Sequence, residues 1–77
     1  MKELIEFIAK SLVEHPNAVS IVEEKAEDGT ILIKLAAARD DMGRIIGKQG
    51  RTAKAMRTLL NAKATRENAR ASLQIVE

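Results

Sequence analysis

The chain of 77 residues contains no cysteine, tryptophan or tyrosine, and it has one phenylalanine, one proline and one histidine. The absence of cysteine excludes disulfide bonds, zinc–thiolate sites and cysteine nucleophiles. With so few aromatic side chains, the chain lacks the stacking platforms that RRM and OB-type domains use to hold bases. Long apolar runs are also missing, so no membrane span or signal peptide is predicted, and a cytoplasmic location is expected.

A chain of this length is sufficient for one small domain, and we expect residues 1–77 to form it. Hydrophobic residues make up 45% of the chain and charged residues 31%, which is typical of a globular domain. A core this small gives only marginal stability, so a partner subunit is expected to add to it.

The net charge of +2 conceals a strong asymmetry along the chain. Residues 1–41 contain five Lys and Arg against nine Asp and Glu, whereas residues 42–77 contain eight against two. Between Met42 and Arg66 there are seven basic residues and no acidic one. This asymmetry predicts a basic surface suited to a polyanion, although a solvated helix face would give the same pattern.

The first predicted element is an amphipathic helix over Lys2–Val13. Its apolar residues recur at helical spacing and form one stripe, with Phe7 at the edge of the stripe and assigned to the core. The helix ends before Pro16, because a proline pushes the residue before it out of the helical region. His15, beside that proline, is expected to be a surface residue or a C-terminal helix cap.

Two strands are predicted next, over Val19–Glu24 and Thr30–Ala36. The turn between them is indicated by Asp28-Gly29, a strong two-residue hairpin signal. Alternating apolar residues fill one face of the second strand, and Leu32 lies on the other face. Apolar residues on both faces indicate a central strand of the sheet.

The remaining predicted elements are a short helix ending at Ile46, a loop over 47–50, a helix from Arg51 to about Ala62, a loop or frayed helix end over 63–70, and a strand over 71–75. Asp40 or Asp41 is expected to cap the short helix by accepting a hydrogen bond from a free N–H group. On the long helix, Leu59 is assigned to the buried side. The order α-β-β-α-α-β predicts an α+β fold with three helices packed on one face of a three-stranded mixed sheet.

The most distinctive segment is Gly47-Lys48-Gln49-Gly50, in which two glycines bracket two polar residues directly before a predicted helix. Glycine lets another backbone approach closely. The first N–H groups of a helix, together with the positive end of its dipole, favour phosphate. A bare G-x-x-G pattern also occurs in structural turns, but the basic residues around this one favour a nucleic-acid backbone site.

Two other phosphate-binding motifs do not fit. A nucleotide P-loop needs a longer spacing than that between Gly43 and Gly47, and Gln49 stands where a magnesium-binding hydroxyl group would be required. A dinucleotide-binding fingerprint fails because no G-x-G-x-x-G follows a strand. No nucleophile–base pair or metal-binding cluster is visible either, so we predict no catalytic residue, no metal site, no cofactor and no enzymatic activity.

The run Ile45-Ile46-Gly47-Lys48-Gln49-Gly50 matches the I-G-x-x-G pattern of KH domains, whose loop clamps four backbone nucleotides. Essentially the whole chain resembles the KhpA family of small stand-alone bacterial KH proteins, most clearly over residues 1–13, 42–60 and 73–77. Two features depart from the family pattern. Arg39 stands where members often have a proline, and residues 63–70 have no clear counterpart.

This resemblance implies a type II KH domain that binds single-stranded RNA. The implied RNA-binding residues are Gly47, Lys48, Gln49, Gly50, Arg44, Ile45, Ile46, Arg51 and Lys54. Lys48 would pair with a phosphate group and Gln49 would donate a hydrogen bond to the RNA backbone. The two isoleucines, together with an unidentified strand residue, would form the floor of an aliphatic groove for bases, unless they pack in the core.

The resemblance also implies a physiological role and partners. It implies an RNA chaperone or post-transcriptional regulator that forms a homodimer and pairs with a larger KH-containing protein of the KhpB (Jag) type. Through that pair it implies an influence on cell-wall synthesis, cell shape and division. A different class of function stays open, namely a protein-interaction or dimerisation module in which the glycine loop has only a structural role.

Overall fold

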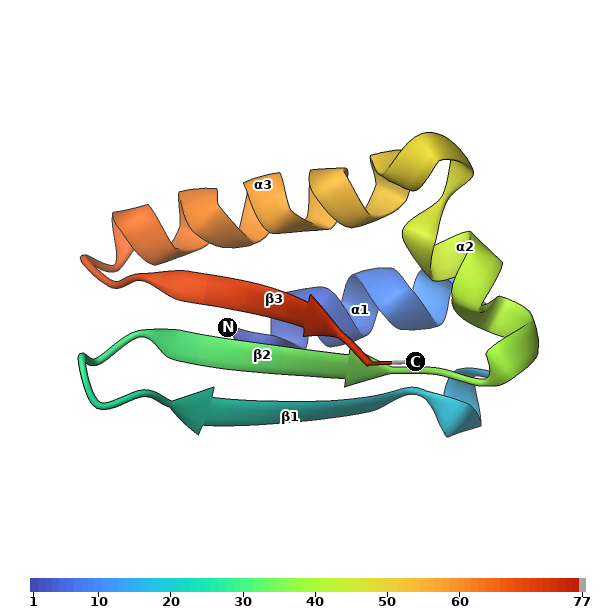
Figure 1. Cartoon of the computed structure of the whole chain (residues 1–77), viewed down its shortest axis with the longest axis horizontal. Coiled ribbons are helices and arrows are strands. Elements are labelled where there is room, and N and C mark those ends of the chain that lie inside the picture. Colours follow the sequence, from blue (N-terminus) through green and yellow to red (C-terminus); the bar gives the residue numbers. More distant parts are fainter. Residues whose placement is uncertain (77) are drawn as a thin grey trace.

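A computed structural model describes residues 1–76 of the chain. Its helices and strands are α1 (Lys2–Leu12), β1 (Ser20–Lys25), β2 (Ile31–Ala36), α2 (Met42–Ile46), α3 (Arg51–Arg66) and β3 (Ala71–Ile75). Short 3-10 turns precede or separate them, namely η1 (Pro16–Ala18), η2 (Arg39–Asp41) and η3 (Lys48–Gly50). The predicted order α-β-β-α-α-β is confirmed (Figure 1).

The sheet is mixed and has the order β1-β2-β3. β2 is the central strand, antiparallel to β1 and parallel to β3, as predicted. The parallel pairing is possible because α2 and α3 form the long crossover that returns the chain to the sheet. The register sets Ile33 beside Leu73 and Leu35 beside Ile75, so these side chains share one face.

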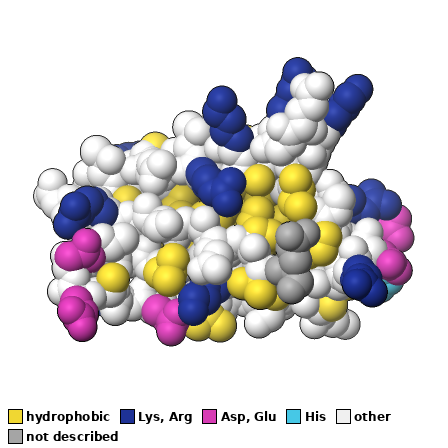
Figure 2. Space-filling model, viewed as in Figure 1, with side chains coloured by type: hydrophobic (Ala, Val, Ile, Leu, Met, Phe, Trp, Pro, Cys, Tyr) yellow, Lys and Arg dark blue, Asp and Glu magenta, His cyan; other side chains and the backbone are white. Residues whose placement is uncertain are grey.

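Charged side chains are unevenly distributed over the surface. Figure 2 shows Lys and Arg side chains projecting at the end where α2 joins α3, while Asp and Glu side chains lie mainly around β1 and near the two ends of the sheet. The predicted basic surface therefore forms on the α3 side of the molecule. Among residues 1–76, no helix is both long enough and apolar enough to cross a bilayer.

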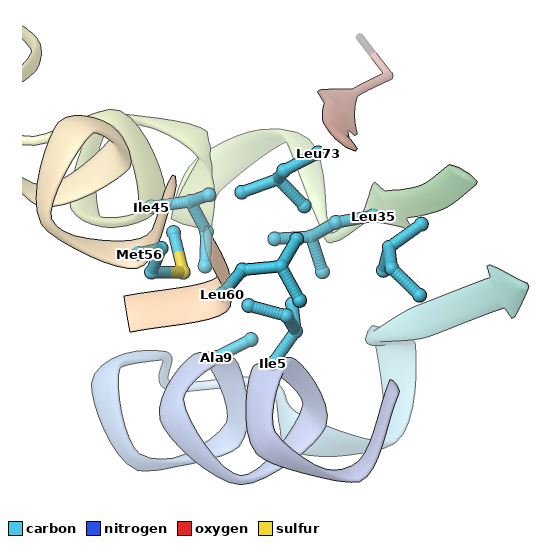
Figure 3. Close-up of a cluster of buried hydrophobic side chains, with 8 residues drawn as sticks. Ile5, Ala9, Leu35, Ile45, Met56, Leu60 and Leu73 are labelled. Atoms are coloured by element: carbon cyan, nitrogen blue, oxygen red, sulfur yellow. The ribbon is translucent and has the colours of Figure 1, made fainter. Parts of the chain in front are cut away.

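One hydrophobic core joins the helices to the inner face of the sheet (Figure 3). Its buried members are Ile5, Ala9, Ile33, Leu35, Ile45, Met56, Leu60 and Leu73. They come from all three helices and from β2 and β3, so α1 and α3 cover the same face of the sheet. α2 contributes the fully buried Ile45 and is thereby held against the core.

The long helix ends later than the sequence predicted, at Arg66 rather than near Ala62. Ala64 is buried on the core side and continues the apolar stripe. Asn68 follows with φ of +56°, and the N–H group of Ala69 donates to the carbonyl oxygen of Ala64 over 2.8 Å. A left-handed residue and this backward hydrogen bond form a Schellman-type C-terminal cap, with asparagine in place of the usual glycine.

Two predicted core residues lie at the surface instead. Phe7 is 73% exposed because it lies on α1 about 200° round the helix from the buried Ile5. Leu59 is 50% exposed because it neighbours Leu60, which takes the core position on α3. Both assignments were therefore wrong, and the molecule presents these two large apolar side chains to solvent.

Candidate nucleic-acid interface

The glycine loop joins α2 to α3 at one end of the molecule, at the upper right in Figure 1. Its backbone is unusual, since Gly47, Gln49 and Gly50 have φ of +77°, +57° and +73°. Residues with side chains rarely adopt such values. The reversal lets α3 begin directly after α2 at a new angle. It also leaves the side chains of Lys48 and Gln49 exposed.

The two glycines of the loop differ in why glycine is needed. A Cβ atom built on Gly47 would lie 2.2 Å from Oγ1 of Thr52 and 2.8 Å from its backbone nitrogen. A Cβ atom on Gly50 would meet no atom of another described part of the chain within 4 Å. Gly47 is therefore required by the packing of the fold itself, whereas Gly50 leaves an open surface that another backbone could approach.

Three of the predicted basic residues lie together around this loop. Lys48, Arg51 and Lys54 are exposed, and none of them has an ion pair within 4.0 Å among the residues that the structure describes. Arg51 and Lys54 lie at the start of α3, whose first N–H groups and positive dipole end attract anions. This end of the molecule thus combines uncompensated positive charge with open backbone.

Arg44 is not grouped with these residues. Its guanidinium group forms an ion pair with Glu14 and lies 3.7 Å from Oδ1 of Asp41. Both partners are acidic residues near the start of α2, at the opposite end of that helix from the glycine loop. Although Arg44 is exposed, its charge is already balanced within the protein.

Asp41 is the one buried charged residue among those described, with 1% of its surface exposed. Its carboxylate accepts hydrogen bonds from the N–H groups of Glu14 and His15, over 3.1 and 3.0 Å, and lies 3.0 Å from Nδ1 of the His15 ring. Burial raises the pKa of Asp41, but these hydrogen bonds and the His15 ring lower it by more, so its pKa lies below the ordinary value.

The prediction that Asp40 or Asp41 caps α2 was therefore wrong. Asp41 occupies the position before the helix, yet no side-chain capping bond forms there. The N–H groups of Glu14 and His15, which follow α1, donate to the two carboxylate oxygens instead. His15 is exposed, which confirms the expectation of a surface residue. Its ring also contacts the Asp41 carboxylate. The Asp41 carboxylate thus ties the start of α2 to the end of α1.

A small groove adjoins the glycine loop. It has a volume of about 240 Å³ and is lined by Ile46, Gly50, Ala53, Arg57 and Ile75. In Figure 2, hydrophobic side chains gather in this region below the projecting basic ones. Apolar walls beside a candidate phosphate site suit a nucleobase, whose flat face gains from leaving water while its edge stays available for hydrogen bonds.

The two adjacent isoleucines divide between core and groove. Ile45 is fully buried in the core and has no surface to offer a ligand, so its assignment to the groove floor is corrected. Ile46 is partly exposed and lines the groove. Neighbouring helical positions point in different directions, so only one of the two can face the groove.

The sequence alone missed three residues of the groove. Ala53 and Arg57 lie on α3, and their i, i+4 spacing on one side of that helix, just after Gly50, could have revealed them. Ile75 comes from β3 and supplies the strand residue that the sequence left unidentified. Its place in the groove depends on the contact of the end of β3 with Ile46 of α2, for which the sequence carries no local signal.

The chemistry available at the site consists of cations, hydrogen-bond donors and an apolar surface. Among residues 1–76, no group of three or more His, Asp or Glu side chains is placed to hold a metal ion. Among the described residues that line the groove, none has a carboxylate, imidazole or hydroxyl group. Such a site is suited to holding an anionic polymer with its bases turned inwards.

Comparison with known proteins agrees with this geometry. The family model for the KH domain of KhpA and KhpB matches residues 2–75. RNA-binding protein KhpA of Clostridium acetobutylicum is 49% identical over 76 residues, which is 99% of this chain and 100% of the relative. RNA-binding protein KhpA of Halalkalibacterium halodurans is 49% identical over 78 residues and aligns along the full length of both chains.

A solved structure shares the fold at much lower sequence identity. Era in complex with MgGDPNP and nucleotides 1506–1542 of 16S ribosomal RNA superposes with a TM-score of 0.63 at 16% identity. The similarity covers 96% of this chain and 28% of that protein, and it concerns the fold alone. The family model spans nearly all of the described residues, and the two KhpA relatives align with this chain from end to end. This chain, with its type II KH fold, therefore belongs to the KhpA/KhpB family of KH-domain proteins.

Proposed function

We propose that this protein binds single-stranded RNA, with the phosphate backbone across Gly47–Gly50 and bases in the adjoining groove. The observation that carries the proposal is the open surface at Gly50, flanked by Lys48 and Arg51, which lack an ion-pair partner among the described residues. The names of the two relatives, both RNA-binding proteins, support it. Because the described residues of the site include no acid–base pair, we propose binding without catalysis.

The loop would hold RNA mainly through its backbone. Lys48 would pair with a phosphate group, and the side-chain amide of Gln49 would donate a hydrogen bond to a phosphate oxygen. Arg51 and Lys54, on the first turn of α3, would extend the positive surface along the strand. Without Cβ atoms at either end of the loop, the two backbones could come close together.

The groove would contribute less than an aromatic platform does. Its walls are aliphatic, and Phe7, the one aromatic residue, lies on α1 and is not among the groove residues. Base stacking on aromatic rings is worth about 1–3 kcal/mol per base. Affinity should therefore be modest, and it should depend strongly on salt.

A salt titration tests the proposal. Fluorescence anisotropy of a labelled single-stranded RNA octamer would be measured between low and physiological salt. With Lys48, Arg51 and Lys54 on phosphates, log K should fall with log salt with a slope of about −2. Binding that is absent even at low salt would reject RNA binding and leave the second candidate function.

The second candidate is an interaction module, and the exposed apolar side chains favour it. Leu4 of α1 and Leu59 of α3 line a shallow hollow with Ala62, and Phe7 lies on the outer side of α1. We propose that this helical face binds a second copy of the chain. The two functions are compatible, because dimerisation would place two loops on one RNA and raise the effective affinity.

Sedimentation tests the dimer. The wild-type protein should be dimeric at micromolar concentration, and Leu59→Glu should be monomeric, because a charge would be buried in the interface. Gln49→Glu is the control, because it makes the same change of net charge at an exposed position outside this hollow, and it should leave the dimer intact. A wild-type monomer at that concentration would reject the dimer.

We further propose that residues 1–77 act as a single cytoplasmic domain and work with a KhpB (Jag)-type protein as an RNA chaperone or post-transcriptional regulator. An influence on cell-wall synthesis, cell shape and division would follow from that pair. Membership of a family whose model covers both KhpA and KhpB supports the proposal. Co-purification with the KhpB-type protein of the same cells tests the proposal. If the two proteins failed to co-purify, both before and after removal of RNA, the partnership would be rejected.

A further inference from the structure

We infer that Arg57 makes the groove prefer bases that present two adjacent hydrogen-bond acceptors, namely guanine through O6 and N7 or cytosine through N3 and O2, over adenine. The inference rests on the proposed binding of RNA. It goes beyond that proposal by assigning the selectivity of the groove to one side chain.

Arg57 is the one polar side chain among the described residues that line the groove. The other described residues that line it are Ile46, Gly50, Ala53 and Ile75, none of which has a side-chain donor or acceptor. A base in this groove could gain van der Waals contact from several residues, but these contacts are similar for all four bases. Discrimination by a side chain would therefore fall to Arg57.

The Arg57 side chain is held against β3. Its Nε atom donates to the carbonyl oxygen of Leu73, over 3.4 Å, and Leu73 is a buried strand residue. This bond uses one of the five N–H donors of the guanidinium group. No ion pair or second hydrogen bond of Arg57 is found among the described residues, so its two terminal nitrogens are available to a ligand.

The chemistry of the guanidinium group decides which base edge fits. Two parallel N–H donors match two adjacent acceptors, as when arginine binds O6 and N7 of guanine. Cytosine offers a comparable pair at N3 and O2. Adenine places the N6 amino group beside its ring nitrogens, so one donor of the fork would face another donor and lose its hydrogen bond to water.

Position along the helix favours a base over a phosphate as the partner of Arg57. It lies seven residues after Gly50, about 10 Å along α3 from the loop. Lys48, Arg51 and Lys54 are closer in sequence to the glycines where the backbone would cross. The side chain that borders the apolar groove is thus separate from those that surround the loop.

The test compares three RNA octamers of uridine in which the two central positions are both C, both G or both A. Anisotropy at low salt should show that wild-type protein binds the C or the G octamer about fivefold more tightly than the A octamer. Arg57→Lys keeps the charge but removes the fork, so the preference should fall below about twofold while affinity for the A octamer stays unchanged. Lys54→Gln, one turn away, should weaken all three octamers equally.

Each outcome bears on a different statement. Equal affinity of wild-type protein for the three octamers, or a preference that survives in Arg57→Lys, would overturn the inference and leave RNA binding intact. If Arg57→Gln weakened the binding of all three octamers equally, as Lys54→Gln should, Arg57 would be assigned to a phosphate group. That result would also overturn the inference. Failure of wild-type protein to bind any octamer would reject the proposed function itself. Circular dichroism confirms that each variant is folded.

Discussion

α2 is only five residues long, yet the polar groups at its two ends have opposite environments. At its start, the Asp41 carboxylate is buried and takes hydrogen bonds from Glu14 and His15, and Arg44 is paired with acidic side chains. At its end, Lys48 and Gln49 are exposed beside a glycine with open space around it. The polar groups at the start of α2 stabilise the fold, whereas Lys48, after its end, has no ion-pair partner among the described residues.

This difference shows why net charge alone does not locate a binding site. Arg44 and Arg51 are both exposed arginines in the basic half of the chain. Arg44 gains little by binding an anion, because it would first have to leave Glu14 and Asp41. Arg51 has no such competitor among the described residues and stands at the start of α3. The arrangement predicts separate effects of mutation at the two ends of α2.

The largest expected effect is on RNA binding at the end of α2. Replacing Lys48 and Gln49 together by Asp should lower RNA affinity at least about 100-fold, because two negative charges would face phosphate. Both side chains are exposed, so the free energy of unfolding should change by less than about 0.5 kcal/mol. Anisotropy and urea unfolding measure the two quantities.

The control for this pair is an equal change of charge at the other end of the molecule. Lys25→Asp with Ser72→Asp also lowers the net charge by three, at exposed positions at the end of β1 and near the start of β3. It should weaken RNA binding only slightly. Equal losses from the two double variants would mean that overall charge, and not the loop, determines affinity.

Substitutions of the two loop glycines should affect fold stability and RNA binding to different extents. Gly47→Ala should destabilise the fold by about 2 kcal/mol or more, because the new Cβ atom meets Thr52 and the φ of +77° is strained. Gly50→Ala has only the strain of φ +73° and should cost about 1 kcal/mol. When affinity is expressed per folded molecule, Gly50→Ala should weaken RNA binding more than Gly47→Ala does. The opposite order of stabilities in urea unfolding would contradict this account of the loop.

At the start of α2, Asp41→Asn should lower stability at neutral pH without changing the RNA affinity of the folded protein. One amide oxygen cannot replace two carboxylate oxygens that accept the N–H groups of Glu14 and His15. Asp40→Asn is the matched control, because Asp40 is exposed and makes no side-chain hydrogen bond among those described. Thermal unfolding compares the two variants.

The same contact predicts a pH dependence. The pKa of Asp41 is lower in the folded protein than in the unfolded chain, where it is about 3.9. The carboxylate therefore contributes its full stabilisation above about pH 4 and loses it as the pH falls through the folded-state pKa. The difference in stability between wild type and Asp41→Asn should narrow below pH 4. A difference that stays constant from pH 7 to pH 3 would exclude this role for the carboxylate.

The smallest expected effect distinguishes the two arginines. Arg51→Gln should lower RNA affinity about threefold, the contribution of one exposed charge contact. Arg44→Gln should lower it by less than about 1.5-fold at physiological salt, because its charge is already paired. Anisotropy titrations of both variants against the same octamer decide the point. A larger loss of RNA affinity for Arg44→Gln than for Arg51→Gln would place the RNA at the start of α2 and contradict the proposed site.

Local sequence patterns predicted the order of elements, the central position of β2 and the glycine loop. They succeeded where a helix stripe, an Asp-Gly turn or a G-x-x-G motif carries its information within a few residues. The later end of α3 was missed because Asn68 is a less common left-handed cap than glycine. That signal was local, and it could have been recognised.

The other errors concern contacts between distant parts of the chain. Asp41 binds N–H groups that lie 26 and 27 residues earlier, and those donors cannot be recognised from the residues around it. Ile75 reaches the groove only because β3 pairs in parallel with β2. Two adjacent isoleucines carry equal apolar character, and the packing of α2 alone determines that Ile45 enters the core and Ile46 the groove.

Mapping the RNA contact by NMR tests the central contrast most directly. Amide chemical shifts of labelled protein would be followed while a single-stranded RNA octamer is added. The largest changes are expected at Gly47–Gly50 and Arg51, with further changes at Arg57 and Ile75, while Glu14, His15 and Asp41 stay unchanged. Changes centred on the start of α2, with the glycine loop unaffected, would contradict the account.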